Sequence, residues 1–270
     1  MSSKNNKYRI CSAMPELVGL DARLNSESRA VFIGAVQWKV GETIKIAFIG
    51  GTEEQKAHVQ KTANQWLKYA NLKFEWNVAV EDSDVRVAFE SGKGSWSFMG
   101  RQCRGVDKTR ATMNLGWLPA KPAANDVGTI LHEFGHTLGL AHEHNSPNAT
   151  LTWRRDVVIA SLSGPPNNWS VETIEANVFA KYKLGESELV ASNFDPLSIM
   201  LYSFPAEWTE EGVATKANDK ISREDKLMIS TMYPIEGGVD VDDEPITTSK
   251  CGCNKGIKDV AKAIYQQFKK

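Results

Sequence analysis

The sequence predicts an α+β fold, in which a mixed sheet packs against helices and is followed by a mainly helical region. Three observations support this prediction. Segments with alternating apolar and polar residues and one amphipathic segment succeed each other in the order strand, helix, strand, strand. A histidine-rich segment in the middle of the chain has the spacing of a helix. Two further helical segments follow it, separated by a turn rich in glycine and proline.

The first half of the chain supplies the predicted sheet. Its strands alternate in polarity and are expected at residues 43–48, 72–78, 85–89 and 111–117. Between the first two strands, residues 53–70 place apolar side chains at helical spacing and charged side chains opposite them, which indicates an amphipathic helix. A second helix is expected to begin at Val127, capped by Asn125 or Asp126.

The second half is predicted to be helical at residues 152–162 and 170–182. The composition then divides the chain into four parts. Residues 1–30 are polar and are interpreted as an N-terminal arm or a short pro-segment, residues 31–234 form the main domain, and residues 235–250 form an acidic linker. Residues 251–270 carry an apolar stripe opposite lysines, which predicts an amphipathic helix. This helix docks on its own domain, binds a partner, mediates self-association or contacts a membrane surface.

Composition and charge exclude several classes of function. The 270 residues are 41% apolar and 24% charged, which is typical of a globular protein with a full core. A formal net charge of −1 argues against a nucleic acid or an anionic membrane as the main partner. No apolar run is long enough to span a bilayer, and the first residues lack the apolar region of a signal peptide. The sequence therefore leaves the compartment open, with a cytoplasmic location or secretion by another route as the options.

Residues 132–144 hold four of the five histidines of the chain. In a helix, His132 and His136 lie about 40° apart on adjacent turns, so both imidazoles can bind one metal ion. His142 is too far along a continued helix to join them, and we expect the helix to end at Gly139, because glycine adopts the left-handed conformation that ends helices. The chain can then turn back and present His142 to the same ion. Three neutral imidazoles favour zinc and leave a fourth position for water.

Glu133 directly follows the first of these histidines, which places its carboxylate beside the open position. There it can take a proton from the attacking water and pass it to a leaving amine, so hydrolysis is the predicted chemistry. A closed structural zinc site is the alternative, but such a site normally fills its fourth position with cysteine or histidine. The only spare imidazole nearby is His144, and we predict that it lies beside the ligands or faces solvent without binding the metal. We expect His58, outside the cluster, to be a surface residue.

The pattern His132-Glu133-x-x-His136-x-x-Gly139-x-x-His142 resembles the extended zinc signature of the metzincin metallopeptidases. Residues 195–202 resemble the methionine turn of the same group, and the whole span from Val31 to Pro234 is similar to microbial astacin-like members. This resemblance implies a two-subdomain fold with a mixed twisted sheet and two long helices above a cleft, and a mainly helical subdomain below. It also implies a final helix that begins at Ser222.

The resemblance also implies roles for single residues. Met200 would form the apolar floor of the site, and Tyr202 would stabilise the oxyanion, as a phenol donor can. A half-buried core tyrosine is the alternative for Tyr202. The segment Trp96-Ser97-Phe98 would form the strand edge that pairs with the substrate backbone, or else a plain surface hairpin. Glu143 would anchor a mature N-terminus.

Four cysteines are too few for a disulfide scaffold of this size: Cys11, Cys103, Cys251 and Cys253. A disulfide or simple thiols are the favoured interpretation. The alternative hypothesis is that Cys11, or the pair Cys251 and Cys253, supplies a thiolate to the fourth zinc position and keeps the enzyme latent.

The predicted function is that of a zinc-dependent endopeptidase with one catalytic Zn²⁺ ion and protein or peptide substrates. In this prediction His132, His136 and His142 bind zinc, and Glu133 is the general base. The alternatives are a latent or non-hydrolytic peptide-binding module of the same fold and a zinc hydrolase of a non-protein amide. Glu133 argues against the binding module, because such a module does not need a general base beside the open metal position.

Overall fold

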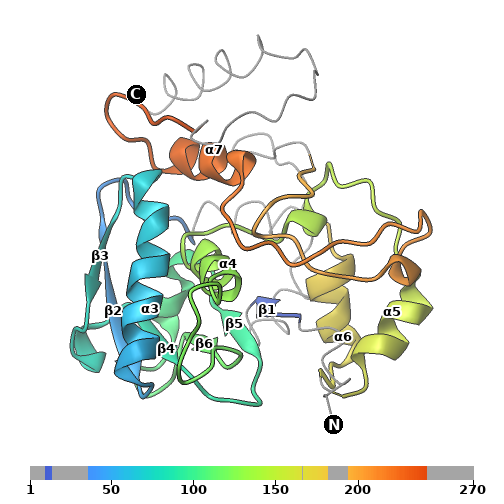
Figure 1. The fold of residues 1–270 in the computed structure, drawn as a ribbon, viewed down its shortest axis with the longest axis horizontal. Helices are drawn as coiled ribbons and strands as arrows, with labels where there is room; N and C mark the ends of the chain where they lie inside the picture. The colour runs from blue at the N-terminus through green and yellow to red at the C-terminus, as the bar shows by residue number, and fades with distance from the viewer. Residues whose placement is uncertain (1–9, 14–35, 166, 182–193, 242–270) are drawn as a thin grey trace.

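The computed structural model describes residues 10–13, 36–165, 167–181 and 194–241. Within these residues the predicted α+β fold is confirmed (Figure 1). The predicted helix at 251–270, its two cysteines and most of the N-terminal arm lie outside the described residues. The described part contains no helix long and apolar enough to cross a membrane.

The sheet has six strands in the order β1-β5-β6-β4-β2-β3. Their bounds are β1 Ser12–Ala13, β2 Thr43–Ile49, β3 Lys73–Trp76, β4 Val85–Ala88, β5 Ser95–Ser97 and β6 Met113–Leu115. All neighbouring strands are parallel except β5 and β6, which pair antiparallel with Trp96 opposite Asn114. The sheet is therefore mixed, as predicted, and the N-terminal strand β1 forms one of its edges.

The α-helices of the described residues fall within the predicted helical segments. They are α3 Glu53–Ala63, α4 Gly128–Thr137, α5 Arg155–Leu162, α6 Val171–Ile174 and α7 Arg223–Met232. Short 3-10 turns occur at η1 Asn64–Lys68, η2 Val80–Asp82, η3 Gly100–Gly105, η4 Glu143–Asn145 and η6 Ala206–Trp208, and one turn of π-helix occurs at η5 Glu175–Phe179. In Figure 1, α3 and α4 lie beside the sheet, whereas α5 and α6 lie on the other side of β1.

Side-chain caps explain where two of the helices begin. Thr52 caps α3 and Ser222 caps α7, each in a capping box with the residue three positions later. The prediction that Asn125 or Asp126 caps α4 was wrong. The cap position is Val127, which makes no side-chain cap bond, and the Asp126 carboxylate instead accepts a hydrogen bond from the Ala123 N–H at 2.7 Å. Asp126 thus stabilises the preceding turn instead of the helix, because a donor three positions before it competes with the donors at the start of α4.

Two apolar cores meet at the methionine turn. The larger core lies between the sheet and helices α3, α4 and α7, and it includes Ile199 and Met200. The smaller core packs around α5 and α6 and includes Leu201 and Tyr202. Ile10 and Cys11, from the N-terminal segment, are buried in this smaller core. Consecutive residues of one turn thus belong to the two halves of the molecule, and the histidine cluster lies at their junction.

Candidate metal centre and active site

Helix α4 presents His132 and His136 to one point. Each ring is oriented by its Nδ1 atom, which lies 2.7 Å from the Ile199 carbonyl oxygen in His132 and 2.8 Å from the Leu140 carbonyl oxygen in His136. Since a carbonyl oxygen accepts only a donor, both Nδ1 atoms carry the proton and both Nε2 atoms are free to bind a metal ion. This is the tautomer that a metal-binding histidine requires.

Gly139 lets the chain turn back after α4. The helix ends at Thr137, and Gly139 follows with a φ of +97°, in the left-handed region that favours glycine. The Leu140 N–H then bonds to the Gly135 carbonyl oxygen at 2.9 Å, which closes the turn. As a result the His142 Nε2 atom lies 3.0 Å from that of His136.

A fourth potential ligand completes this cluster. The Cys11 Sγ atom lies 2.9 Å from Nε2 of His132, 3.2 Å from Nε2 of His142 and 3.8 Å from Nε2 of His136. The four ligand atoms all lie within 4.8 Å of one another. A tetrahedral zinc ion with bonds of about 2.0–2.3 Å needs ligand atoms roughly 3.3–3.8 Å apart. The separations here lie on both sides of this range, so the four residues could hold the ion after shifts of a few tenths of an ångström to about one ångström. The geometry favours the thiolate hypothesis for Cys11 over the interpretation as a disulfide or a simple thiol.

Burial sets the protonation of the ligands. It lowers the pKa of His132 to about 4 and holds the pKa values of His136 and His142 well below the usual range. The three imidazoles are therefore neutral near pH 7 and available to a metal ion. Burial, together with the neighbouring Glu133, raises the pKa of the Cys11 thiol. A coordinating metal ion reverses this effect, because a metal-bound thiol is deprotonated.

Glu133 is fully buried, and neither of its carboxylate oxygens has a hydrogen-bond partner. Burial raises its pKa well above the ordinary value for glutamate. An unpartnered buried carboxyl group is costly and calls for an explanation, and a substrate or a water molecule in the adjacent cavity would supply the missing partner.

Tyr202 faces the histidines from the smaller core. Its ring centroid lies 4.2 Å from that of His142 and 4.2 Å from that of His144. The phenol hydroxyl donates a hydrogen bond to the Cys11 backbone carbonyl oxygen at 2.5 Å. Tyr202 is thus buried, and in this conformation its hydroxyl is engaged by the N-terminal segment.

The methionine turn lies directly under α4. A Cβ atom added to Gly135 would lie 2.3 Å from the Met200 Sδ atom, so the small residue at this position allows the methionine to approach. The turn is held from α7 by the buried carboxylate of Asp225, which accepts hydrogen bonds from the Ser198 hydroxyl at 2.7 Å and the Ile199 N–H at 2.8 Å. Asp225 therefore fixes the peptide that orients His132, a connection that the sequence analysis missed.

The predicted substrate edge is occupied by the chain itself. Strand β5 contains Trp96 and Ser97, whereas Phe98 lies just beyond it and is buried in the larger core. On the side of β5 away from β6, β1 pairs in parallel, with Ser12 opposite Trp96 and Ala13 opposite Ser97. Without β1, β5 would be the edge strand.

Three polar residues outside the cluster have local partners. His144 is fully buried, and its Nε2 atom lies 2.9 Å from the Asn177 carbonyl oxygen, so it lies beside the ligands and not among them. The His58 Nε2 atom lies 3.1 Å from the Asp126 carbonyl oxygen, and His58 is not part of the metal-binding cluster. Glu143 accepts the Asp195 N–H at 2.9 Å, and burial raises its pKa to about 7.

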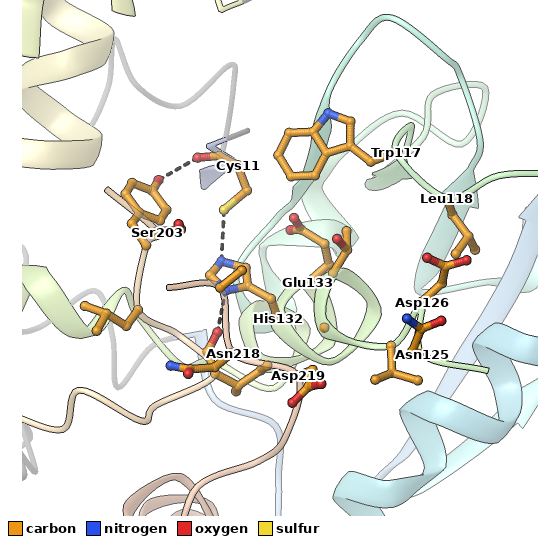
Figure 2. A pocket seen from close by; sticks show the side chains of 17 residues that line it. Cys11, Trp117, Leu118, Asn125, Asp126, His132, Glu133, Ser203, Asn218 and Asp219 are labelled. Carbon is orange, nitrogen blue, oxygen red and sulfur yellow. Dashed lines mark hydrogen bonds between the residues drawn. The ribbon is translucent and has the colours of Figure 1, made fainter. Parts of the chain in front are cut away.

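A cavity of about 340 Å³ opens beside the cluster. Figure 2 shows Cys11, His132 and Glu133 at one end of it, and Asp126 and Asp219 around its other side. Beyond the motif, two lining residues have a role predicted from the sequence, Tyr202 as the oxyanion donor and Cys11 as a possible metal ligand. No motif marks the remaining loop residues of the lining, such as Asn218 and Asp219. The apolar pair Ile10-Cys11 within an otherwise polar arm is the sequence feature that indicates burial of Cys11.

The chain is similar to known peptidases. The family model for Astacin, a family of peptidases, matches residues 34–233. Zinc metalloproteinase nas-30 of Caenorhabditis elegans is 26% identical over 193 residues, which cover 70% of this chain and 23% of that protein. One structure of myroilysin has a TM-score of 0.70 and 33% identity and covers 75% of this chain and 98% of its own, and another has a TM-score of 0.58 and 30% identity. The chain spans less than a quarter of the length of the curated relatives it matches.

Proposed function

The chain belongs to the astacin family of peptidases, and from this premise we propose that it is a zinc-dependent endopeptidase that cleaves proteins or peptides. The cofactor of the family is one catalytic zinc ion, and the histidine cluster suits it. The observation that carries the proposal is the convergence of three neutral Nε2 atoms beside the buried, unpartnered Glu133 carboxyl group and an adjoining cavity.

Each residue of the site would have a distinct role. When bound, zinc supplies a Lewis acid that polarises the scissile carbonyl and lowers the pKa of water. His132, His136 and His142 would hold the ion through Nε2. Glu133 would take a proton from the attacking water and pass it to the leaving amine. The Tyr202 hydroxyl would donate a hydrogen bond to the oxyanion.

Replacement of the general base tests this proposal. We expect zinc-loaded protein to cleave casein in a chelator-sensitive manner, and the Glu133→Gln variant, which keeps the size of the side chain, to lose at least about 100-fold in kcat. Zinc content, measured by atomic absorption, should be the same in both proteins. Equal cleavage by the two proteins would refute the role of Glu133. Zinc binding without cleavage of casein, even after Cys11→Ala, would favour the peptide-binding module or a hydrolase of a non-protein amide.

We also propose that the described conformation is a latent form of this peptidase. With zinc bound to the three histidines, the Cys11 sulfur would take the position that the reaction needs for water, and the Cys11 carbonyl oxygen accepts the Tyr202 hydroxyl. The adjacent residues Ser12 and Ala13 cover the β5 edge. One short segment would thus block the fourth metal position, the oxyanion donor and the strand edge at once.

Cys103 offers a matched control for Cys11, because it is also a buried free cysteine but lies outside the cluster. We expect Cys11→Ser to increase the initial rate of peptide cleavage, and Cys103→Ser to leave it unchanged. In the cobalt-substituted full-length protein, Cys11→Ser should abolish the sulfur-to-metal charge-transfer band, which Cys103→Ser should retain. A charge-transfer band of equal intensity in both variants would contradict the proposed coordination.

A further inference from the structure

The cavity beside the metal-binding cluster combines apolar walls with an acidic rim. Its apolar lining includes Trp117, Leu118 and Ile199. Figure 2 shows Trp117 on the side of Cys11 and Glu133, and Leu118 beside Asp126. Asp126 and Asp219 line the part near the start of α4, as Figure 2 shows. Glu133 is aimed into the cavity, and both of its oxygens are buried without a partner. A side chain that fills this cavity is therefore placed next to the reacting groups.

The ionisable side chains at the rim of the cavity are acidic. Among the described residues that line the cavity, the carboxyl groups belong to Glu133, Asp126 and Asp219, and there is no lysine or arginine. The Asp126 carboxylate accepts one backbone hydrogen bond through Oδ2, which leaves capacity for another donor. Within the described part of the chain, the exposed Asp219 carboxylate makes no hydrogen bond or ion pair. Both groups are thus available to a ligand.

Close packing fixes the backbone that carries Asp219 relative to the active site. A Cβ atom added to Gly128 would lie 2.6 Å from the Asn218 carbonyl oxygen and 3.5 Å from the Asp219 Cα atom. The segment that carries Asp219 therefore lies against the first turn of the helix that carries His132 and Glu133. Asn218 also donates to the Ser198 carbonyl oxygen at 2.8 Å, which ties this segment to the methionine turn.

We propose that this cavity binds a lysine or arginine side chain of the substrate, with Asp219 and Asp126 as the residues that determine this specificity. The aliphatic part of such a side chain packs along the apolar walls, while its cationic end reaches the carboxylates at the rim, as long basic side chains do at partly apolar surfaces. An acidic substrate side chain is repelled by the same rim. This inference rests on the proposed peptidase function and names its substrate class.

Cleavage of a peptide series tests the inference. The peptides share one cleaved sequence and carry lysine, norleucine or glutamate at one position at a time around the scissile bond, and the protein is the zinc-loaded full chain, with and without Cys11→Ala. At one fixed position, kcat/KM should be highest for lysine and lowest for glutamate. Asp219→Asn should reduce the lysine-to-glutamate ratio by up to about fivefold, the most that an exposed ion pair supplies. Asp219→Lys should invert the preference.

Two comparisons decide the outcome. Asp82→Asn removes an exposed carboxylate from η2, away from the cavity lining, and should leave the ratio unchanged. Binding of the lysine and glutamate peptides to the zinc-loaded Glu133→Gln variant, measured by calorimetry, should show the same preference without hydrolysis.

If Asp219→Asn changes thermal stability but changes the lysine-to-glutamate ratio of neither kcat/KM nor binding affinity, the carboxylates only stabilise helix α4 and the inference is wrong. If the binding preference is present but no variant cleaves, the inference stands and the peptidase function fails.

Discussion

The hydrogen bond that the Tyr202 hydroxyl makes in this structure excludes the oxyanion role proposed for it. The Tyr202 hydroxyl donates a hydrogen bond to the Cys11 carbonyl oxygen at 2.5 Å. It can donate to an oxyanion only after the N-terminal segment has moved away. We expect Tyr202→Phe to lower kcat by about 100-fold, the usual effect of removing one preorganised donor. KM and zinc content should change little, because the ring still packs against His142 and His144. A steady-state kinetic comparison with the zinc-loaded wild type measures this.

The same substitution separates the active role from a packing role. If Tyr202 only fills the core, Tyr202→Phe keeps nearly all of its contacts, and kcat should match that of the wild type. A large loss of thermal stability together with an unchanged kcat of the folded fraction would contradict the oxyanion role. Because the hydroxyl also holds the N-terminal segment, the variant should release that segment more readily than the wild type does.

At the scale of elements, hydrogen bonds through the methionine turn connect α7 to the histidine cluster. Asp225 accepts the Ile199 N–H, and the Ile199 carbonyl oxygen accepts the His132 Nδ1–H. The Asp225 carboxylate accepts three hydrogen bonds, from the Ser198 hydroxyl and from the N–H groups of Ile199 and Ser222. Asp225→Asn places an amide group there, so a buried donor is left unpaired. We expect a loss of about 1–3 kcal/mol in the free energy of unfolding. Zinc affinity, measured by competition with a chelator, should fall about 10-fold to 100-fold.

Ser222→Ala provides the control for this prediction. It removes the cap of α7 but keeps the Asp225 carboxylate and its bonds to the turn. The cap is worth about 1 kcal/mol, so stability should fall while zinc affinity stays at the wild-type value. Equal losses of zinc affinity in the two variants would show that α7 acts only through general stability.

Sequence reasoning succeeded where a local pattern determines the structure. The spacing of His132 and His136 and the glycine at 139 are sufficient to predict a helix that ends before His142, and the alternating strands are sufficient to predict a mixed sheet. It was less successful where contacts join distant residues, because a Cys11 thiolate was only the alternative to a disulfide or a simple thiol, and the role of Asp225 was missed. The Cys11 sulfur and His132 are 121 positions apart in the chain, and Asp225 and Ile199 are 26 apart, so no periodicity links either pair. The cap of α4 failed for a different reason, since two competing donors were equally close in sequence.

At the scale of the whole molecule, the N-terminal segment links the two halves. Ile10 packs in the smaller core, Cys11 lies at the metal centre, and Ser12 and Ala13 pair with β5 of the sheet. Two paired residues alone are too few to hold a strand in place. The segment should therefore depend on the metal ion for its attachment, and the ion should depend on the segment for its fourth ligand.

Hydrogen exchange measures this dependence directly. In the zinc-loaded full chain, we expect the amides of residues 10–13 and of β5 to be protected, and chelation of zinc to increase their exchange while the amides of β2, in the middle of the sheet, stay protected. Cys11→Ser should give the faster exchange even with zinc present, because its hydroxyl is a poor zinc ligand. Cys103→Ser should behave as the wild type. If zinc removal leaves exchange at residues 10–13 unchanged, packing of Ile10 alone holds the segment, and departure of the thiolate would not be sufficient to open the cleft.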